Sequence, residues 1–129
     1  MSYYFNATVG MPFEEAINKV TAELKKEGFG ILTEIDVKET LKKKLNVDFR
    51  PYKILGTCNP PFAYEALQAE DKIGLMLPCN VIVQEVSPGL VEVAAIDPAF
   101  TMQVIENPSL ETIAKAVREK LSKVLTNIL

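Results

Sequence analysis

The 129-residue chain contains no histidine. Ser-His-Asp and Cys-His nucleophilic catalysis are therefore excluded, together with zinc sites that need an imidazole ligand. Any acid–base catalysis would fall to carboxylates, thiols, tyrosines or lysines. Phosphate-binding glycine loops are missing as well, because the six glycines are dispersed and form neither a GxGxxG nor a Walker motif.

Cysteine is scarce, with Cys58 and Cys79 as the two thiols. Nothing marks a secreted scaffold that depends on disulfides, so we expect both to be reduced. The N-terminal residues lack the basic start and apolar core of a secretory signal, and no apolar run is long enough to span a bilayer. These absences predict a cytoplasmic protein that does not enter a membrane.

The composition is that of an ordinary globular protein, with 48% hydrophobic and 24% charged residues. Its length fits one domain over residues 1–129, and no linker, repeat or low-complexity tract divides it. A net charge of −3 argues against general affinity for nucleic acid or an anionic membrane.

The first part of the chain alternates strand and helix patterns. Residues 3–9 alternate apolar and polar side chains, which predicts a half-buried strand. Apolar residues from Phe13 to Leu24 recur at helical spacing, and Gly28 can end that helix in a left-handed conformation. Residues 29–35 predict a second strand, and Asp36 begins a second helix as its N-cap.

The later part predicts a strand, a helix, a hairpin and a long last helix. The strand covers residues 52–58, and the helix has Asn59 as N-cap, Pro60 at its first position and a helix-compatible stretch over residues 62–69. The hairpin covers residues 80–86 and 90–96 around a type II turn at Pro88-Gly89, and the last helix is opened by Asn107-Pro108. The conformation of residues 73–77 stays open, and Asp97-Pro98 is expected to end the hairpin.

Together these elements predict an α+β fold: a two-layer sandwich with a mixed or largely antiparallel sheet of about five strands. The long helices would pack mainly on one face. The other face would carry Tyr4, Asn6, Thr8, Gln84 and Glu92. A sheet face of such mixed polarity is either hydrated or buried in a dimer. The lysines of the second helix, at positions 38 and 42–44, are interpreted as a solvated face or, less favoured, an anion-binding patch.

Two similar motifs contain both thiols: Cys58-Asn59-Pro60-Pro61 and Pro78-Cys79-Asn80. Cys58 would precede a helix N-cap, where the helix partial charge favours a thiolate that acts as a nucleophile or a soft-metal ligand. The competing interpretation makes each cysteine a small buried residue, with each asparagine serving a cap or a turn.

If the strands ending at Cys58 and starting at Cys79 are antiparallel neighbours, the two thiols could meet at one end of the sheet. With Met102 or Asp97 they would then form an incomplete soft-metal site. Glu65, Glu85 and Asp97 are each candidate general bases, although a solvated carboxylate is the favoured interpretation at all three positions.

The sequence also resembles the family named "domain of unknown function 302". The resemblance is carried by the stretches Ile54–Pro60 and Gly74–Val83, by parts of residues 28–45, and by Asp97-Pro98. It implies a compact two-layer α/β domain that forms a homodimer, and it supplies no catalytic assignment. It also raises the expectation that Cys58, Asn59, Pro78, Cys79 and Asn80 form a ligand-binding site.

Three functions therefore compete. The preferred one is a binding module for a small ligand or a soft metal ion near the two motifs. The second is a structural homodimer without a site, and the third is a thiol-dependent enzyme with Cys58 as nucleophile. The sequence specifies neither a ligand nor a cofactor.

Overall fold

The computed structural model describes residues 2–129, and Met1 lies outside them. It contains one five-stranded sheet in the order β1-β5-β4-β3-β2, and every described strand pair is antiparallel. The elements along the chain are β1 (Tyr4–Val9), α1 (Phe13–Lys26), β2 (Gly30–Asp36), α2 (Val37–Leu45), β3 (Tyr52–Cys58), α3 (Pro60–Ala69), the 3-10 helix η1 (Asp71–Met76), β4 (Cys79–Ser87), β5 (Leu90–Ile96), α4 (Pro98–Met102) and α5 (Ser109–Asn127). The predicted α+β class is confirmed.

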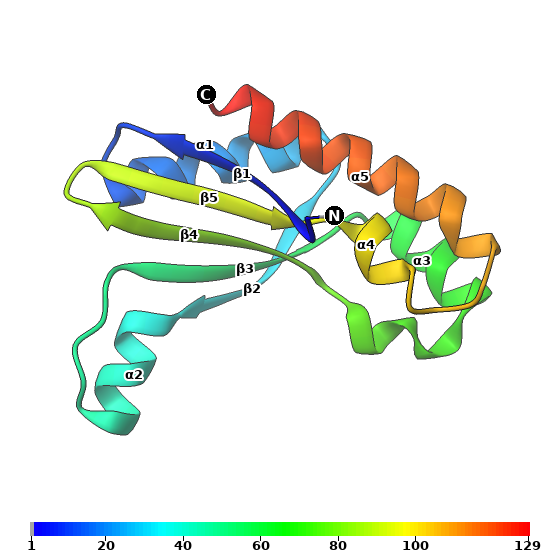
Figure 1. The fold of residues 1–129 in the computed structure, drawn as a ribbon, viewed down its shortest axis with the longest axis horizontal. Coiled ribbons are helices and arrows are strands. Elements are labelled where there is room, and N and C mark those ends of the chain that lie inside the picture. The colour runs from blue at the N-terminus through cyan, green and yellow to red at the C-terminus, as the bar shows by residue number, and fades with distance from the viewer. Residues whose placement is uncertain (1) are drawn as a thin grey trace.

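One face of the sheet is covered by α1 and α5, which lie side by side across it (Figure 1). Alternate residues of the central strands point into this layer and are fully buried, namely Val81, Val83, Val91 and Val93. The helices meet them with apolar stripes at helical spacing: Val20 and Leu24 in α1, and Leu121 and Val124 in α5. This layer contains the main hydrophobic core.

Several element ends follow the local signals in the sequence. Asp36 caps α2, because its carboxylate accepts the backbone N–H of Glu39 over 3.0 Å. Gly28 adopts φ +87° after α1, and Gly89 adopts φ +77° in the hairpin turn that follows Pro88. Both conformations favour glycine because a side chain there would be strained.

The opposite face of the sheet carries no helix layer (Figure 1). Tyr4, Asn6, Thr8, Gln84 and Glu92 lie on it, as predicted. Glu92 accepts hydrogen bonds from Asn6 over 2.9 Å and from Gln84 over 2.8 Å, so both of its carboxylate oxygens are used within the chain. We call this surface the open sheet face.

Some elements differ from the expectations. Residues 98–102 form the short helix α4 rather than a simple turn, because Pro98 starts the helix and Asp97 accepts the backbone N–H of Ala99. Residues 73–76, part of the stretch whose conformation the sequence left open, belong to the 3-10 helix η1. α3 begins at Pro60, the first helical position that the sequence indicated, whereas α5 begins at Ser109, whose N–H is accepted by the Asn107 side chain. In residues 2–129 no helix combines the length and the apolarity that a bilayer span requires.

Candidate functional site

The two cysteine motifs meet at one end of the sheet. β3 ends at Cys58 and its antiparallel neighbour β4 begins at Cys79, with Thr57 directly opposite Cys79 in the register. The Thr57 hydroxyl donates a hydrogen bond of 2.8 Å to the Cys79 carbonyl oxygen. Both thiols are free. The hypothesis that topology brings them together is therefore supported by the register.

A cavity of about 330 Å³ opens at this meeting point. Four of the five predicted site residues line it: Cys58, Asn59, Pro78 and Cys79. The remaining walls are apolar side chains of α3, α4, α5 and the β2 region, among them Phe29, Phe62, Ala66, Met102 and Val117. No charged side chain of the described residues belongs to the lining. The site is thus an apolar cavity with two thiols, and we call it the thiol cavity.

The polar side chains of the lining are already committed to partners within the chain. Thr57 is bonded to the Cys79 carbonyl, and the Asn59 amide donates a hydrogen bond of 3.1 Å to the carbonyl of Glu27. Asn59 occupies the N-cap position of α3 but makes no side-chain cap bond there. The predicted capping role of its side chain is therefore wrong: Asn59 fastens the end of β3 to the end of α1.

Asn80 is not part of the thiol cavity. It is exposed in β4 opposite Gly56, and it lines a hollow of the open sheet face beside Tyr4 and Tyr52. Successive side chains of a strand point to opposite faces, which keeps Asn80 out of the thiol cavity that Cys79 lines. A separate hollow of about 280 Å³ is lined by Pro78, Cys79 and Asn80 together. Of the motif Pro78-Cys79-Asn80, the first two residues therefore line the thiol cavity, and Asn80 lines only the hollows outside it.

Burial governs the chemistry of Cys79. Desolvation raises the pKa of its thiol to about 11, and the nearby Cys58 charge adds to the rise. At neutral pH Cys79 is therefore an uncharged thiol that contributes a small apolar surface to the lining of the cavity. A metal ion that used it as a ligand would first have to displace its proton.

The N-terminus of α3, which follows Cys58, has few N–H groups that could stabilise a thiolate. Pro60 and Pro61 occupy its first two positions and have no N–H groups, and the N–H of Ala63 is used by the Asn59 carbonyl over 3.0 Å. Of the N–H groups that usually point out of the first helical turn, that of Phe62 remains. The expected stabilisation of a Cys58 thiolate by this helix therefore has a weak structural basis.

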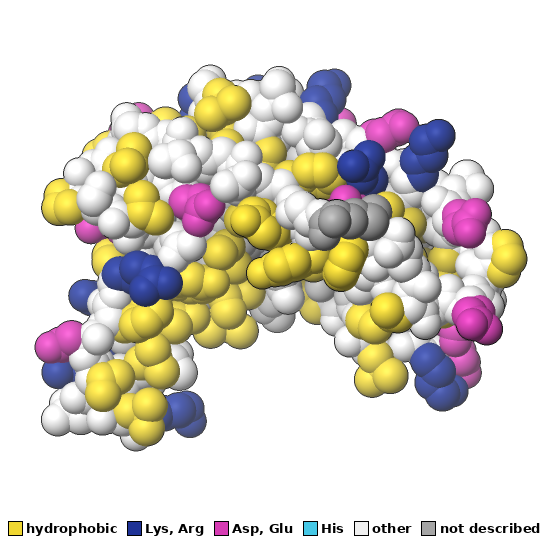
Figure 2. Space-filling model, viewed as in Figure 1, with side chains coloured by type: hydrophobic (Ala, Val, Ile, Leu, Met, Phe, Trp, Pro, Cys, Tyr) yellow, Lys and Arg dark blue, Asp and Glu magenta, His cyan; other side chains and the backbone are white. Residues whose placement is uncertain are grey.

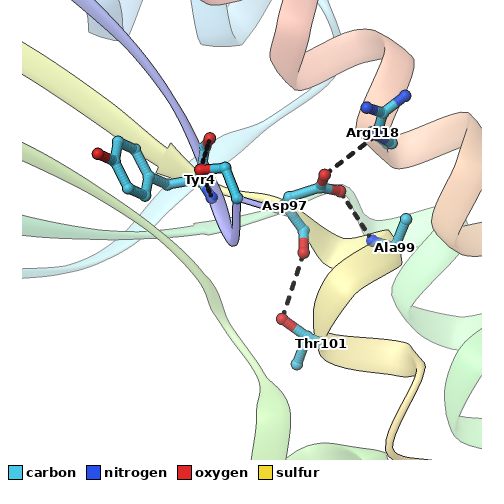
Figure 3. A network of polar contacts seen from close by, with 6 residues as sticks. Tyr4, Asp97, Ala99, Thr101 and Arg118 are labelled. Atoms are coloured by element: carbon cyan, nitrogen blue, oxygen red, sulfur yellow. Dashed lines mark hydrogen bonds and ion pairs between the residues drawn. The ribbon is translucent and has the colours of Figure 1, made fainter.

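The metal-ligand hypothesis is met in part. Cys58, Cys79 and Met102 line the same cavity, as the hypothesis required. Asp97 belongs to a different environment: its carboxylate accepts hydrogen bonds from the Ala99 N–H over 3.0 Å and from Arg118 over 3.1 Å, and it is 3% exposed (Figure 3). Within residues 2–129 no three His, Cys, Asp or Glu side chains group as a metal site.

The candidate general bases also lie elsewhere. Glu65 is exposed on α3, Glu85 lies within β4, and neither belongs to the lining of the thiol cavity. Asp97 is held by its ion pair and its helix cap. The described residues thus bring no carboxylate to the two thiols.

Sequence reasoning missed most of the cavity wall. The alanines at positions 63 and 66 of α3 and 114 of α5 leave space where larger side chains would have closed the contact between these helices. Their signal was the helical spacing of small residues, three apart, beside Leu67. A larger hollow of about 550 Å³ between α4 and α5 contains neither cysteine.

Comparison with known proteins gives a consistent picture. A family model described as "Domain of unknown function DUF302" matches residues 5–128. The chain is also similar to the "uncharacterized conserved protein DUF302 from Bacillus stearothermophilus", whose crystal structure has 29% sequence identity and a TM-score of 0.89, with 98% of each chain covered. No curated protein matches the chain.

Proposed function

The chain belongs to the DUF302 family, whose name states no activity, and from that premise we propose that it binds a small, uncharged and largely apolar molecule in the thiol cavity. The observation that carries the proposal is the meeting of both cysteine motifs on one apolar cavity. Its volume of about 330 Å³ falls at the lower end of small-molecule sites, which run from roughly 300 to 1,000 Å³.

The lining favours an uncharged ligand. A charged group would lose its hydration in the cavity without meeting an opposite charge, which is costly. The thiols are weak hydrogen-bond donors and polarizable contacts, so they suit an aromatic ring or a short alkyl chain. Cys58 and Cys79 act in this proposal as contact residues, and Asn59 and Pro78 shape the same end of the cavity.

Mapping a defined probe onto the protein tests the proposal. n-Butylbenzene is titrated into ¹⁵N-labelled protein while backbone amide shifts are followed. We expect saturable shifts that cluster on residues 57–67, 77–79 and 113–117. Shifts confined to the open sheet face, or none up to the solubility limit of the probe, would remove the proposal.

Binding of a soft metal ion is the other branch of the same idea. Two thiols and the Met102 thioether line the cavity, but the raised pKa of Cys79 opposes ligation at neutral pH. Metal content of protein purified without chelator is compared with that of the Cys58→Ser/Cys79→Ser variant. We expect equal contents, whereas one bound metal ion per wild-type chain would favour the metal branch.

A thiol-dependent enzyme with Cys58 as nucleophile has less support. The chain has no histidine, and the prolines of α3 remove two N–H groups next to Cys58. The alkylation rate of Cys58 at pH 7 is measured in the Cys79→Ala background, where Cys58 is the sole thiol. A rate far above that of a free-thiol standard would support the thiol-dependent enzyme over the binding module.

We propose in addition that the protein is a homodimer, and the open sheet face is the observation that favours it. Tyr4 is 40% exposed there and Ile35 46% exposed, over a sheet whose other face is covered by helices. Sedimentation velocity between 1 and 100 µM is expected to show a dimer. A cytoplasmic location is part of the same proposal, since both cysteines are free thiols.

A further inference from the structure

Two segments project from opposite ends of the strands and flank the open sheet face (Figure 1). One contains α2 and the residues up to position 50, and we call it the basic arm. The other contains α3 and η1, residues 60–76, and we call it the acidic arm. Figure 2 shows the hollow between them, with hydrophobic side chains gathered above it.

The two arms carry opposite charge. The basic arm has five cations against two carboxylates: Lys38, Lys42, Lys43, Lys44 and Arg50, with Glu39 and Asp48. The acidic arm has three carboxylates against one cation: Glu65, Glu70 and Asp71, with Lys72. The whole chain has a net charge of −3, so the positive charge of the basic arm is a local feature that the overall charge does not explain.

Both arms also expose apolar side chains. α2 contains no buried residue, and Leu45 after its lysines is 66% exposed. On the acidic arm Leu75 is 85% exposed and Met76 38% exposed. Side chains of this kind on projecting segments are typical of a surface that another molecule covers.

The open sheet face between the arms can be covered by another molecule at low electrostatic cost. Glu92 already accepts from Asn6 and Gln84, and Gln84 accepts from Arg50 over 2.8 Å. The carboxylate most central to the open sheet face therefore keeps its hydrogen bonds when water is removed. Ile82 and Ala94 lie opposite each other on the same face beside this network.

We infer that two copies of the chain pack through their open sheet faces so that the basic arm of each copy lies along the acidic arm of the other. This pairing rests on the homodimer proposed above. A two-fold axis that runs across the strands, between the two sheets, brings unlike arms together twice. An axis along the strands would instead place basic arm against basic arm, and the like charges would repel.

Charge reversal at exposed positions tests the pairing. Lys42→Glu/Lys44→Glu inverts the basic arm, and Glu65→Lys/Asp71→Lys inverts the acidic arm. The matched control is Lys25→Glu/Lys115→Glu, because both lysines are exposed on α1 and α5, away from the open sheet face. Circular dichroism and thermal melts verify that each variant is folded.

Each single-arm reversal is expected to weaken dimerisation and to raise the dimer dissociation constant by at least about tenfold in 50 mM salt. Two residues are substituted in each of the two copies, so four contacts between unlike charges become contacts between like charges. The variant that reverses both arms is expected to recover wild-type affinity, because the unlike pairing is restored with exchanged signs. High salt is expected to reduce all these differences. The control variant should dimerise as the wild type does.

The outcomes separate the inference from the proposal beneath it. A wild-type protein that stays monomeric at 100 µM would overturn the homodimer and the pairing together. A dimer that is unaffected by reversal of either arm would overturn the pairing and leave the dimer standing. A dimer weakened by the control alone would move the interface to the helical face.

Discussion

The hydroxyl of Thr57 donates a 2.8 Å hydrogen bond to the carbonyl oxygen of Cys79, and this bond joins the two cysteine motifs. Thr57 is buried and Cys79 faces it across the strand pair, so the end of β3 and the start of β4 are held together beside the thiol cavity. The cavity therefore has a rigid wall made by the sheet and further walls made by helices.

The buried Cys79 thiol predicts a pH dependence of stability. Burial raises its pKa in the folded protein to about 11, above the value of 9.0 for an unperturbed thiol. Between pH 9 and 11 the folded state keeps a proton that the unfolded state loses, so the free energy of unfolding falls as pH rises. Relative to Cys79→Ala, the wild type should lose roughly 2 kcal/mol over this range.

Urea unfolding at pH 8 and at pH 10.5 checks this prediction. The Cys79→Ala variant serves as the reference because it keeps the same lysines and tyrosines, which also titrate at high pH, but lacks the buried thiol. Parallel stability curves for the two proteins would show that Cys79 titrates in the folded state as an exposed thiol does.

Asn59 is predicted to act through its amide donor. Asn59→Ala should destabilise the protein by about 1–2 kcal/mol, because the Glu27 carbonyl loses its side-chain partner. Asn59→Asp should cost more, since a carboxylate would face that carbonyl oxygen. Chemical denaturation measures both; a role limited to helix capping would instead make aspartate as good as asparagine.

Gly56 is predicted to tolerate no side chain. A Cβ atom there would overlap the Thr33 hydroxyl and lie 2.8 Å from Cγ of Pro78. Gly56→Ala should therefore destabilise the protein by about 2 kcal/mol or more. Thr33→Ala in the same chain removes the closer of the two contacts.

The double variant should recover part of the lost stability and leave the strain against Pro78. Thermal unfolding of the wild type, the two single variants and the double variant gives the coupling between the two sites. Additive effects of Gly56→Ala and Thr33→Ala would contradict the predicted contact.

Much of the fold could be predicted because its signals are local. Asp36 as a cap, Gly28 after α1 and Gly89 in the hairpin turn depend on residues a few positions away, and the structure confirms them. The alternation in β1 likewise predicted which of its residues lie on the open sheet face. Such features are encoded in a short window of sequence.

The features that were missed depend on distant partners. Asn59 looked like a helix cap from its neighbours, but its amide partner is Glu27, 32 residues earlier. The position of Asn80 outside the thiol cavity follows from strand pleating once the register of β4 is known. The thiol cavity is made by small side chains on separate helices, and no local pattern specifies that their spacing leaves a volume unfilled.

The central claim is that the thiol cavity holds an apolar ligand, and a cavity-filling variant tests it most directly. Ala63 is half-buried in the cavity wall, so Ala63→Leu fills the space with three more carbons; Ala22→Leu, exposed on α1, is the matched control. Thermal melts confirm that both variants are folded.

The measurement is the n-butylbenzene dissociation constant of the three proteins, by calorimetry or NMR titration. For the wild type and Ala22→Leu we expect a value on the order of 0.1–1 mM, as suits a ligand of about ten heavy atoms. Ala63→Leu should bind at least about tenfold more weakly because the added carbons occupy the ligand's volume. Equal affinity in all three proteins would contradict the account.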